Sequence, residues 1–163
     1  MGRLNKAIDL IVFYFASTAL ILLVLICFAQ VVARYVVGAS YAWAEEVSVC
    51  LMLWATWAGA CYAIKQGSHL QIPLLPDSLS AKGKLILQSV MGVFIVAFLC
   101  IVTFTSRTII DGLTNATFIS LPNVPLNIMY YSVPVGCIFM IYYIIRMAVT
   151  GWKILHDQGK RGV

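Results

Sequence analysis

The chain has 163 residues, of which 62% are hydrophobic and 10% are charged, and its formal net charge is +5. Soluble domains are about 45–50% apolar and about 25% charged, so this composition excludes an ordinary soluble domain. It also excludes a disordered chain, because disorder needs low hydrophobicity and high charge. We therefore predict an integral membrane protein. A spanning helix needs about 20 mostly apolar residues, so the length allows roughly four or five of them.

Long runs without any charged residue follow one another along the chain. They are Leu10–Ala33, Val47–Ile64, Leu85–Ser106 and the apolar stretch Leu126–Ile145. Such runs are typical of transmembrane helices. We predict an all-α integral membrane protein, with residues 1–163 as one domain of four transmembrane helices. The predicted spans are about 8–35, 43–64, 80–110 and 126–147. Pro134 lies inside the last of them, where neighbouring helices tolerate a kink.

Lysine and arginine residues are concentrated on one side of this topology. The N-terminal segment, the second loop and the C-terminal segment share one side and carry nine basic residues. The other side carries two, Arg34 and Arg107. Because basic loops stay in the cytoplasm, we predict that both termini are cytoplasmic. The positive net charge then reflects topology and contact with anionic membrane lipids, and we expect no nucleic-acid partner.

The sequence offers no pattern typical of an enzyme or a metal site. All five cysteines lie in apolar runs, and both histidines, His69 and His156, lie outside the spans. We therefore predict no catalytic residues, no cofactor and no metal. Ion-coupled carriers place ionisable groups near the bilayer centre, whereas every charge here lies at or beyond the end of a span. We expect the protein to be the partner of a carrier.

The segment after the first span contains the most informative polar residues. Arg34 ends that span, and Trp43, Glu45 and Glu46 open the next helix, whose positive dipole end favours carboxylates. One interpretation is interfacial anchoring by aromatic residues, with Arg34 paired to one of the glutamates. A second is a docking patch for another subunit. A third is an ion or substrate site, although these groups are too exposed at the water boundary to be selective.

The second predicted helix carries small residues at a four-residue spacing, namely Ala55, Gly59 and Ala63, while Trp54 lies on another face. This pattern permits close helix approach, either within the chain or with a partner helix. His69 follows the helix in a loop; an ordinary interfacial histidine is one interpretation, and a pH-sensing or partner-contact residue is the other.

The order of several short motifs resembles a known family. The motifs are Gln30-Val-x-x-Arg34-Tyr, Trp43-Ala-Glu45-Glu46, Trp54-x-x-Trp-Ala-Gly59-Ala60, Ala63-x-x-x-Gly67-x-His69-Leu, Leu121-Pro122-x-x-Pro125 and Pro134-Val-Gly136. Their order and spacing over nearly the whole chain resemble the small membrane (DctQ-like) subunit of tripartite ATP-independent periplasmic (TRAP) transporters.

The resemblance implies a function and a set of partners. Such a subunit pairs with a large permease subunit, and both work with a periplasmic substrate-binding protein. Uptake is of organic acids such as C4-dicarboxylates or sialic acids and is driven by sodium, and the small subunit is a scaffold in the bacterial inner membrane. The residues assigned by position to subunit contact or helix positioning are Arg34, Trp43, Glu45, Glu46, Trp54, Gly59, Gly67 and His69.

Two other hypotheses remain at this point. The chain could be a small autonomous carrier or homo-oligomeric channel, with Gln30, Thr103 and Thr105 lining a pore. It could also be a membrane redox or haem enzyme, in which case the purified protein would show haem or quinone absorbance. We expect no such absorbance, because haem ligation in a membrane needs axial histidines within the helices.

Overall fold

A computed structural model describes residues 3–66 and 81–161 and contains four helices that are long and apolar enough to cross a membrane. This confirms the predicted all-α class with four spanning helices. The elements are α1 (Arg3–Val32), the π-helical turn η1 (Ala33–Val37), α2 (Ala42–Lys65), α3 (Ala81–Gly112), the short α4 (Asn127–Tyr130) and α5 (Ser132–Arg161). Gly67 and His69 lie outside the described residues.

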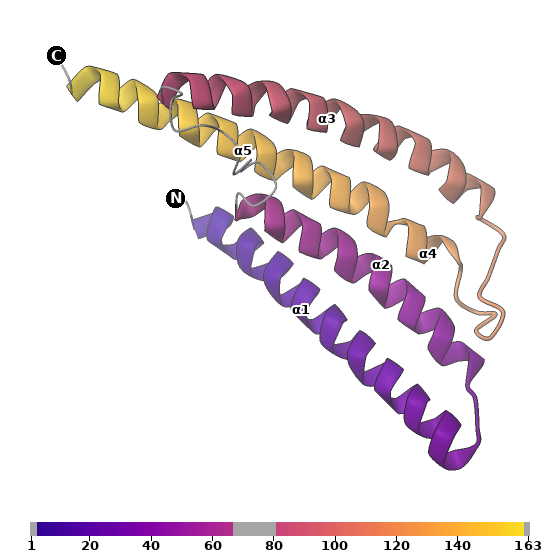
Figure 1. Cartoon of the computed structure of the whole chain (residues 1–163). Coiled ribbons are helices and arrows are strands. Elements are labelled where there is room, and N and C mark those ends of the chain that lie inside the picture. The colour runs from indigo at the N-terminus through magenta and orange to yellow at the C-terminus, as the bar shows by residue number, and fades with distance from the viewer. Residues whose placement is uncertain (1–2, 67–80, 162–163) are drawn as a thin grey trace.

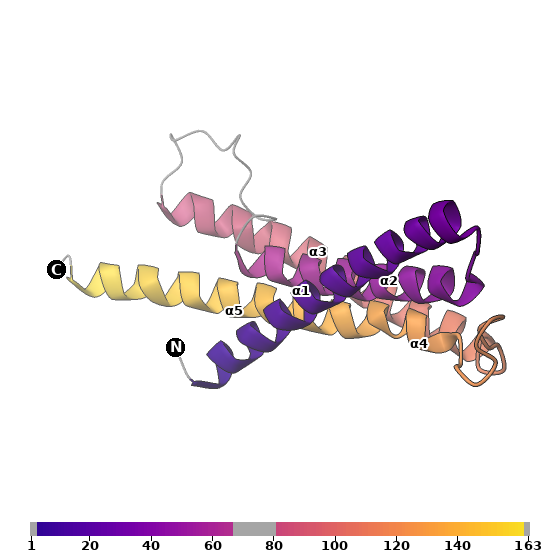
Figure 2. The same cartoon turned by 90° about the horizontal axis from the view of Figure 1, so that it is seen from below.

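The four long helices form a single twisted layer rather than a closed bundle. Figure 1 shows them side by side in the order α3, α5, α2 and α1, and α1 packs on α2, α2 on α5, and α5 on α3. In the view from below, α1 crosses α2 at an angle (Figure 2). Both termini lie at one end, which we call the terminal end; the connections from η1 to α2 and from α3 to α4 lie at the other, the loop end.

A close contact inside the layer joins α2 and α5. A Cβ atom added to Gly136 would lie 2.8 Å from the Cβ of Trp57, so only glycine fits there without movement. The thiol of Cys61 also lies 3.3 Å from the Gly136 carbonyl oxygen, to which it donates a hydrogen bond. Small residues let membrane helices approach closely and gain dispersion contacts. The chain uses Gly136 for this purpose, whereas a Cβ added to Gly59 would meet open space.

The last span is interrupted near its start, and Pro134 explains why. We expected this proline inside the fourth spanning helix, with a tolerated kink. In the structure α4 ends at Tyr130 and α5 begins at Ser132, which places Pro134 in the first turn of α5. Proline has no N–H to donate to the carbonyl four residues earlier, and its ring clashes with that carbonyl. In the first turn of a helix this donor is not needed. The hydroxyl of Ser132 donates instead to the carbonyl of Met129, at 2.7 Å.

We predict that Gly136→Ala destabilises the protein and that Gly59→Ala does not. The added methyl group at position 136 must separate α2 from α5, an overpacking cost of about 1–3 kcal/mol. Both variants gain the same helix propensity, so their difference isolates the contact with Trp57. Unfolding in detergent micelles, followed by circular dichroism, measures it. Equal stabilities of the two variants would show that this contact does not hold the layer together.

Candidate subunit interface

At the loop end, α1 changes into a π-helical turn that presents Arg34 and Tyr35 to the outside. Both side chains are exposed, Tyr35 by 80%. The turn ends at Gly38, whose φ of 72° lies in the left-handed region that glycine adopts without strain. The N–H groups of Gly38 and Ala39 both donate to the Ala33 carbonyl, the latter at 3.1 Å. Single π-helical turns are frequent at functional sites.

The start of α2 lies beside this turn. The Gln30 side chain donates a hydrogen bond to the Tyr41 carbonyl at 3.4 Å, and the Tyr41 and Trp43 rings lie 6.5 Å apart between centroids. Trp43 and Glu45 are exposed. Among the described residues Arg34 forms no ion pair with either glutamate, so the pairing that we considered from the sequence is not made.

Glu46 instead holds the loop that joins α3 to α4. One of its carboxylate oxygens accepts hydrogen bonds from the backbone N–H groups of Ile119 and Ser120, at 2.9 and 3.3 Å. The other oxygen accepts from Ser120 at 3.1 Å. Hydrogen bonds to a charged group are roughly twice as strong as neutral ones. The carboxylate at the start of α2 therefore fixes a segment more than 70 positions away in the sequence.

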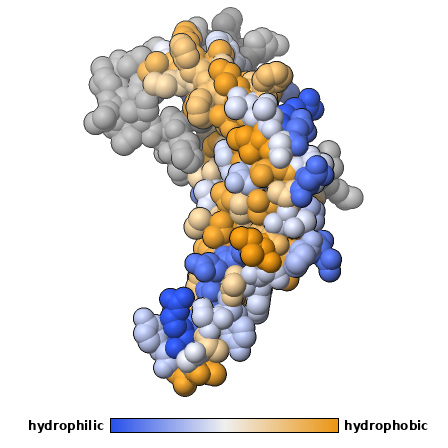
Figure 3. Space-filling view, turned by 90° about the vertical axis from the view of Figure 1, so that its right-hand side faces the viewer, coloured by the Kyte–Doolittle hydropathy of each residue, from blue (hydrophilic) through white to orange (hydrophobic). Residues whose placement is uncertain are grey.

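The loop itself is folded back like a small hairpin. Thr117 and Pro125 form an isolated antiparallel bridge, and the N–H of Phe118 donates to the Val124 carbonyl at 3.1 Å. Phe118 is buried, whereas Ile119 at the Glu46 contact is 93% exposed. Viewed from the loop end, hydrophilic and hydrophobic patches alternate over the surface (Figure 3). The arrangement presents a large apolar side chain beside the half-buried carboxylate of Glu46.

The other predicted site residues lie on different faces of α2. Trp54 packs edge-on against Phe15 of α1, with 5.7 Å between ring centroids, and lines a small cavity of about 210 Å³. Gly59 lines a groove of about 300 Å³ between α1 and α2, together with Ala55. Because Trp54 and Gly59 are five residues apart on a helix, they point to different faces. The predicted set therefore occupies three places: the loop end and two faces of α2.

A polar cluster at the terminal end was missed by the sequence analysis. Asp9 of α1 forms ion pairs with Arg146 of α5 at 2.9 Å and with Lys65 of α2 at 3.5 Å. Arg146 donates a second hydrogen bond to the other Asp9 oxygen at 3.4 Å, and the Tyr142 hydroxyl donates to Asn5 at 3.0 Å. Asp9 and Arg146 each bound a charge-free run on the same side of the predicted topology. Residues at the ends of such runs lie at a similar depth in the membrane, and this similarity was the signal that could have paired them from the sequence.

Comparison with known proteins identifies the class of protein. Residues 23–154 match the family of tripartite ATP-independent periplasmic transporters, DctQ component. The chain belongs to this family. A DctQ component is a small permease subunit of a TRAP transporter, so the chain is a transport protein and not an enzyme. With four spanning helices, it is a multi-pass protein of the bacterial inner membrane.

Individual relatives agree with the family. The chain is 27% identical to the ectoine TRAP transporter small permease protein TeaB of Halomonas elongata over 66% of this chain and 56% of that protein, just over half its length. It is 24% identical to a putative TRAP transporter small permease protein of Haemophilus influenzae, over 96% of this chain and 95% of the relative. It is 28% identical to the sialic acid TRAP transporter small permease protein SiaQ of Vibrio cholerae, over 77% of this chain and 72% of that protein.

In this DctQ-family chain, we predict that Glu46→Ala releases the loop at Ile119 and Ser120. Loss of hydrogen bonds to a carboxylate, worth about 1.5–3 kcal/mol, should accelerate amide exchange at these two residues by roughly 10–100-fold. Hydrogen–deuterium exchange with mass spectrometry measures the change. Glu45→Ala is the matched control, because Glu45 is exposed and leaves the loop contacts intact. Similar exchange in both variants would refute the role of Glu46.

A second substitution tests the terminal-end cluster. Asp9→Asn leaves Lys65 and Arg146 without their shared counter-charge, and we expect a loss of about 1–3 kcal/mol of stability. Asp111→Asn, an exposed aspartate at the loop end of α3, should have little effect. The double variant Asp9→Asn with Arg146→Gln should cost less than the sum of the single changes, because the two residues interact directly. Additive costs, measured by unfolding in detergent, would contradict this coupling.

Proposed function

We propose that this DctQ-family subunit is a scaffold for a large permease subunit, and that the complex takes up organic acids. The uptake is driven by sodium and depends on a periplasmic substrate-binding protein. The observation that carries the proposal is the absence of charge from the middle of all four spans. A scaffold subunit stabilises the part of the transporter that does not move, while the large permease subunit binds and moves the substrate.

The distribution of charge supports a role without direct ion coupling. The runs between charged residues contain 24, 18, 22 and 34 residues. Asp9 and Arg146 lie inside the first and last candidate spans, but towards the terminal end and away from the span centres. Groups that bind or relay coupling ions inside a membrane are usually ionisable and pair within the protein interior. The cluster of Asp9, Lys65 and Arg146 joins the N-terminal part of α1 and the last residue of α2 to the middle of α5, on the side of the terminal end. We assign it to structure and not to transport.

The open layer supports a role in contact with a larger membrane protein. Helices α1 and α3 at the two edges are the least buried of the four, and large apolar side chains are exposed on both. The exposed apolar faces of these two helices are suited to packing against lipid and against a permease subunit. Trp54 and Gly59 lie beside cavities on different faces of α2, and we propose them as positions for helix packing against that subunit.

The loop end supports contact with a soluble protein. Nine basic residues on the side of the termini against two on the other favour cytoplasmic termini, which would place the loop end in the periplasm. Arg34, Trp43 and Glu45 are exposed there, beside the loop held by Glu46. We propose this surface as a contact for the large subunit or the binding protein. Relatives named for ectoine and for sialic acid support a small organic solute as the substrate.

The assembly is tested by co-purification of the tagged chain with the co-expressed large permease subunit. We predict that Arg34→Ala lowers the recovery of the large subunit or the uptake rate about fivefold or more, the effect of losing an interface residue worth over 1 kcal/mol. Membrane insertion should be unchanged. Arg107→Ala is the control, because Arg107 is also an exposed arginine near the loop end. Equal recovery and uptake for both variants would exclude Arg34 from the interface.

Deletion of the chain tests the scaffold role itself. Sodium-driven uptake should stop, because the large subunit would lack its static support. Retained uptake with a stable large subunit would overturn the proposal. Substrate flux through liposomes that contain this chain alone would instead favour the autonomous carrier or channel.

A further inference from the structure

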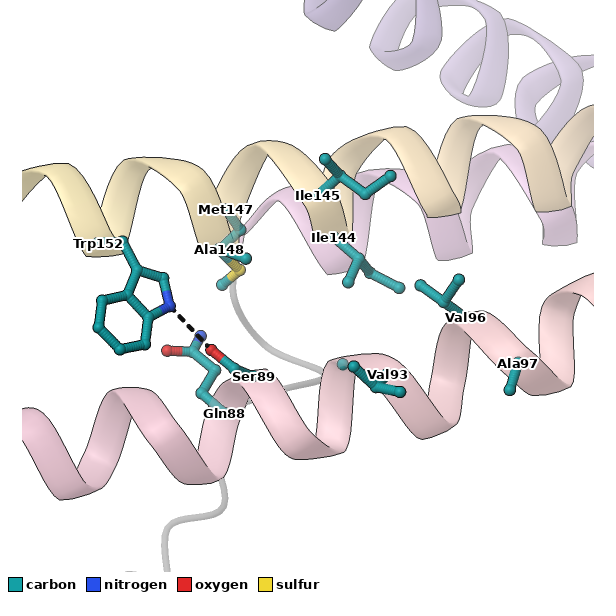
Figure 4. Close-up of a pocket in the computed structure, with 11 residues that line it drawn as sticks. Gln88, Ser89, Val93, Val96, Ala97, Ile144, Ile145, Met147, Ala148 and Trp152 are labelled. Atoms are coloured by element: carbon teal, nitrogen blue, oxygen red, sulfur yellow. Dashed lines mark hydrogen bonds between the residues drawn. The ribbon is translucent and has the colours of Figure 1, made fainter.

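A cavity lies between α3 and α5, towards the terminal end. Its volume is about 500 Å³. Figure 4 shows the side chains of Val93 and Val96 on α3 directed towards Ile144 on α5, with Trp152 at one end. Nearly all of the lining is apolar. A cavity without polar partners does not hold water well, so an apolar ligand fits it better.

One end of the cavity is polar. There the indole N–H of Trp152 lies 3.2 Å from the hydroxyl oxygen of Ser89, and Gln88 lies beside them (Figure 4). Trp152 is half exposed. Tryptophan prefers the level of the lipid headgroups, where its ring meets acyl chains and its N–H meets polar groups. The cavity therefore runs from a headgroup-level mouth into the apolar interior between two helices.

Basic residues lie near the ends of α3 and α5 that are next to this mouth. Lys153 is exposed and follows Trp152, and Lys82 and Lys84 lie in the first turn of α3, which has no acidic residue. Towards its C-terminal end, the sequence of α5 contains one acidic residue, Asp157, and two basic residues, Lys160 and Arg161. A basic pocket between transmembrane helices is suited to an anionic lipid headgroup.

We propose that the cavity between α3 and α5 binds one anionic phospholipid. An acyl chain occupies the apolar part between Val93 and Ile144, and the phosphate lies at the mouth beside Trp152 and Lys153. Charge complementarity selects this ligand over a neutral lipid, and the apolar depth of the cavity selects it over a free phosphate. The proposal depends neither on the substrate of the transporter nor on which side of the membrane holds the termini.

The test uses tryptophan fluorescence of the full chain in phosphatidylcholine nanodiscs. Brominated phosphatidylglycerol, which is anionic, and brominated phosphatidylcholine, which is neutral, are titrated separately, because bromine quenches a tryptophan that it contacts. The signal of Trp152 is the difference between the unchanged chain and Trp152→Phe. We expect half-maximal quenching of this signal at an at least fivefold lower fraction of the anionic lipid, since each basic residue near the surface contributes about this factor.

Matched variants separate the headgroup from the acyl chain. Lys153→Gln should reduce the preference for the anionic lipid about fivefold, whereas Arg107→Gln at the loop end should leave it unchanged. Ala148→Phe fills the cavity and should abolish quenching of Trp152 by the anionic lipid. Ala29→Phe adds the same side chain at an exposed position of α1 and should not affect it.

Three results would overturn the proposal. Equal quenching by the two lipids would show that the mouth does not select charge. Unchanged quenching in Ala148→Phe would show that the acyl chain lies elsewhere. Loss of quenching when the chain is co-purified with the large permease subunit would show that protein covers the cavity. Failure of the scaffold proposal leaves the lipid test intact, because that test measures binding to this chain and not uptake.

Discussion

The contact between Gly136 of α5 and Trp57 of α2 joins the two halves of this molecule. Among the described residues, the backbone of α1 lies closest to that of α2 and the backbone of α3 closest to that of α5, so the layer depends on the pairing of α2 with α5. Inside a bilayer no hydrophobic effect drives helices together, because lipid tails are as apolar as the side chains. Close approach and dispersion must replace it, and the missing Cβ of Gly136 makes that approach possible.

Polar contacts at the two ends complete what the apolar centre begins. At the terminal end, Asp9 connects α1 to α2 and α5 through Lys65 and Arg146. At the loop end, Glu46 connects α2 to the segment that follows α3. Charged pairs cost least where water and headgroups are near, and both connections lie away from the centres of the spans. An apolar middle with polar links on both sides fits the scaffold role that we propose.

The family and the geometry together direct attention to surfaces instead of a catalytic centre. As a DctQ component, the chain contributes to a transporter, and its edge helices leave much of their area exposed. The exposed area is not uniform. The loop end carries charged and aromatic groups, the linings of the α1–α2 groove and of the α3–α5 cavity are uncharged, and the exposed Lys153 follows Trp152 at the end of that cavity. Each therefore suits a different neighbour: a protein at the loop end, a helix at the groove and a lipid at the cavity.

The sequence by itself determined the class, the four spans and the family, because the bilayer imposes a rule that acts along the chain: uncharged runs of sufficient length must span it. It did not determine lateral neighbours. Helices that are apolar on every face carry little periodic signal for which face packs, so the sequence pointed to the stripe at Gly59, whereas the close approach is at Gly136. The interactions of Glu46 and Asp9 join residues far apart in sequence, and only tertiary structure places a carboxylate beside a distant backbone N–H or guanidinium.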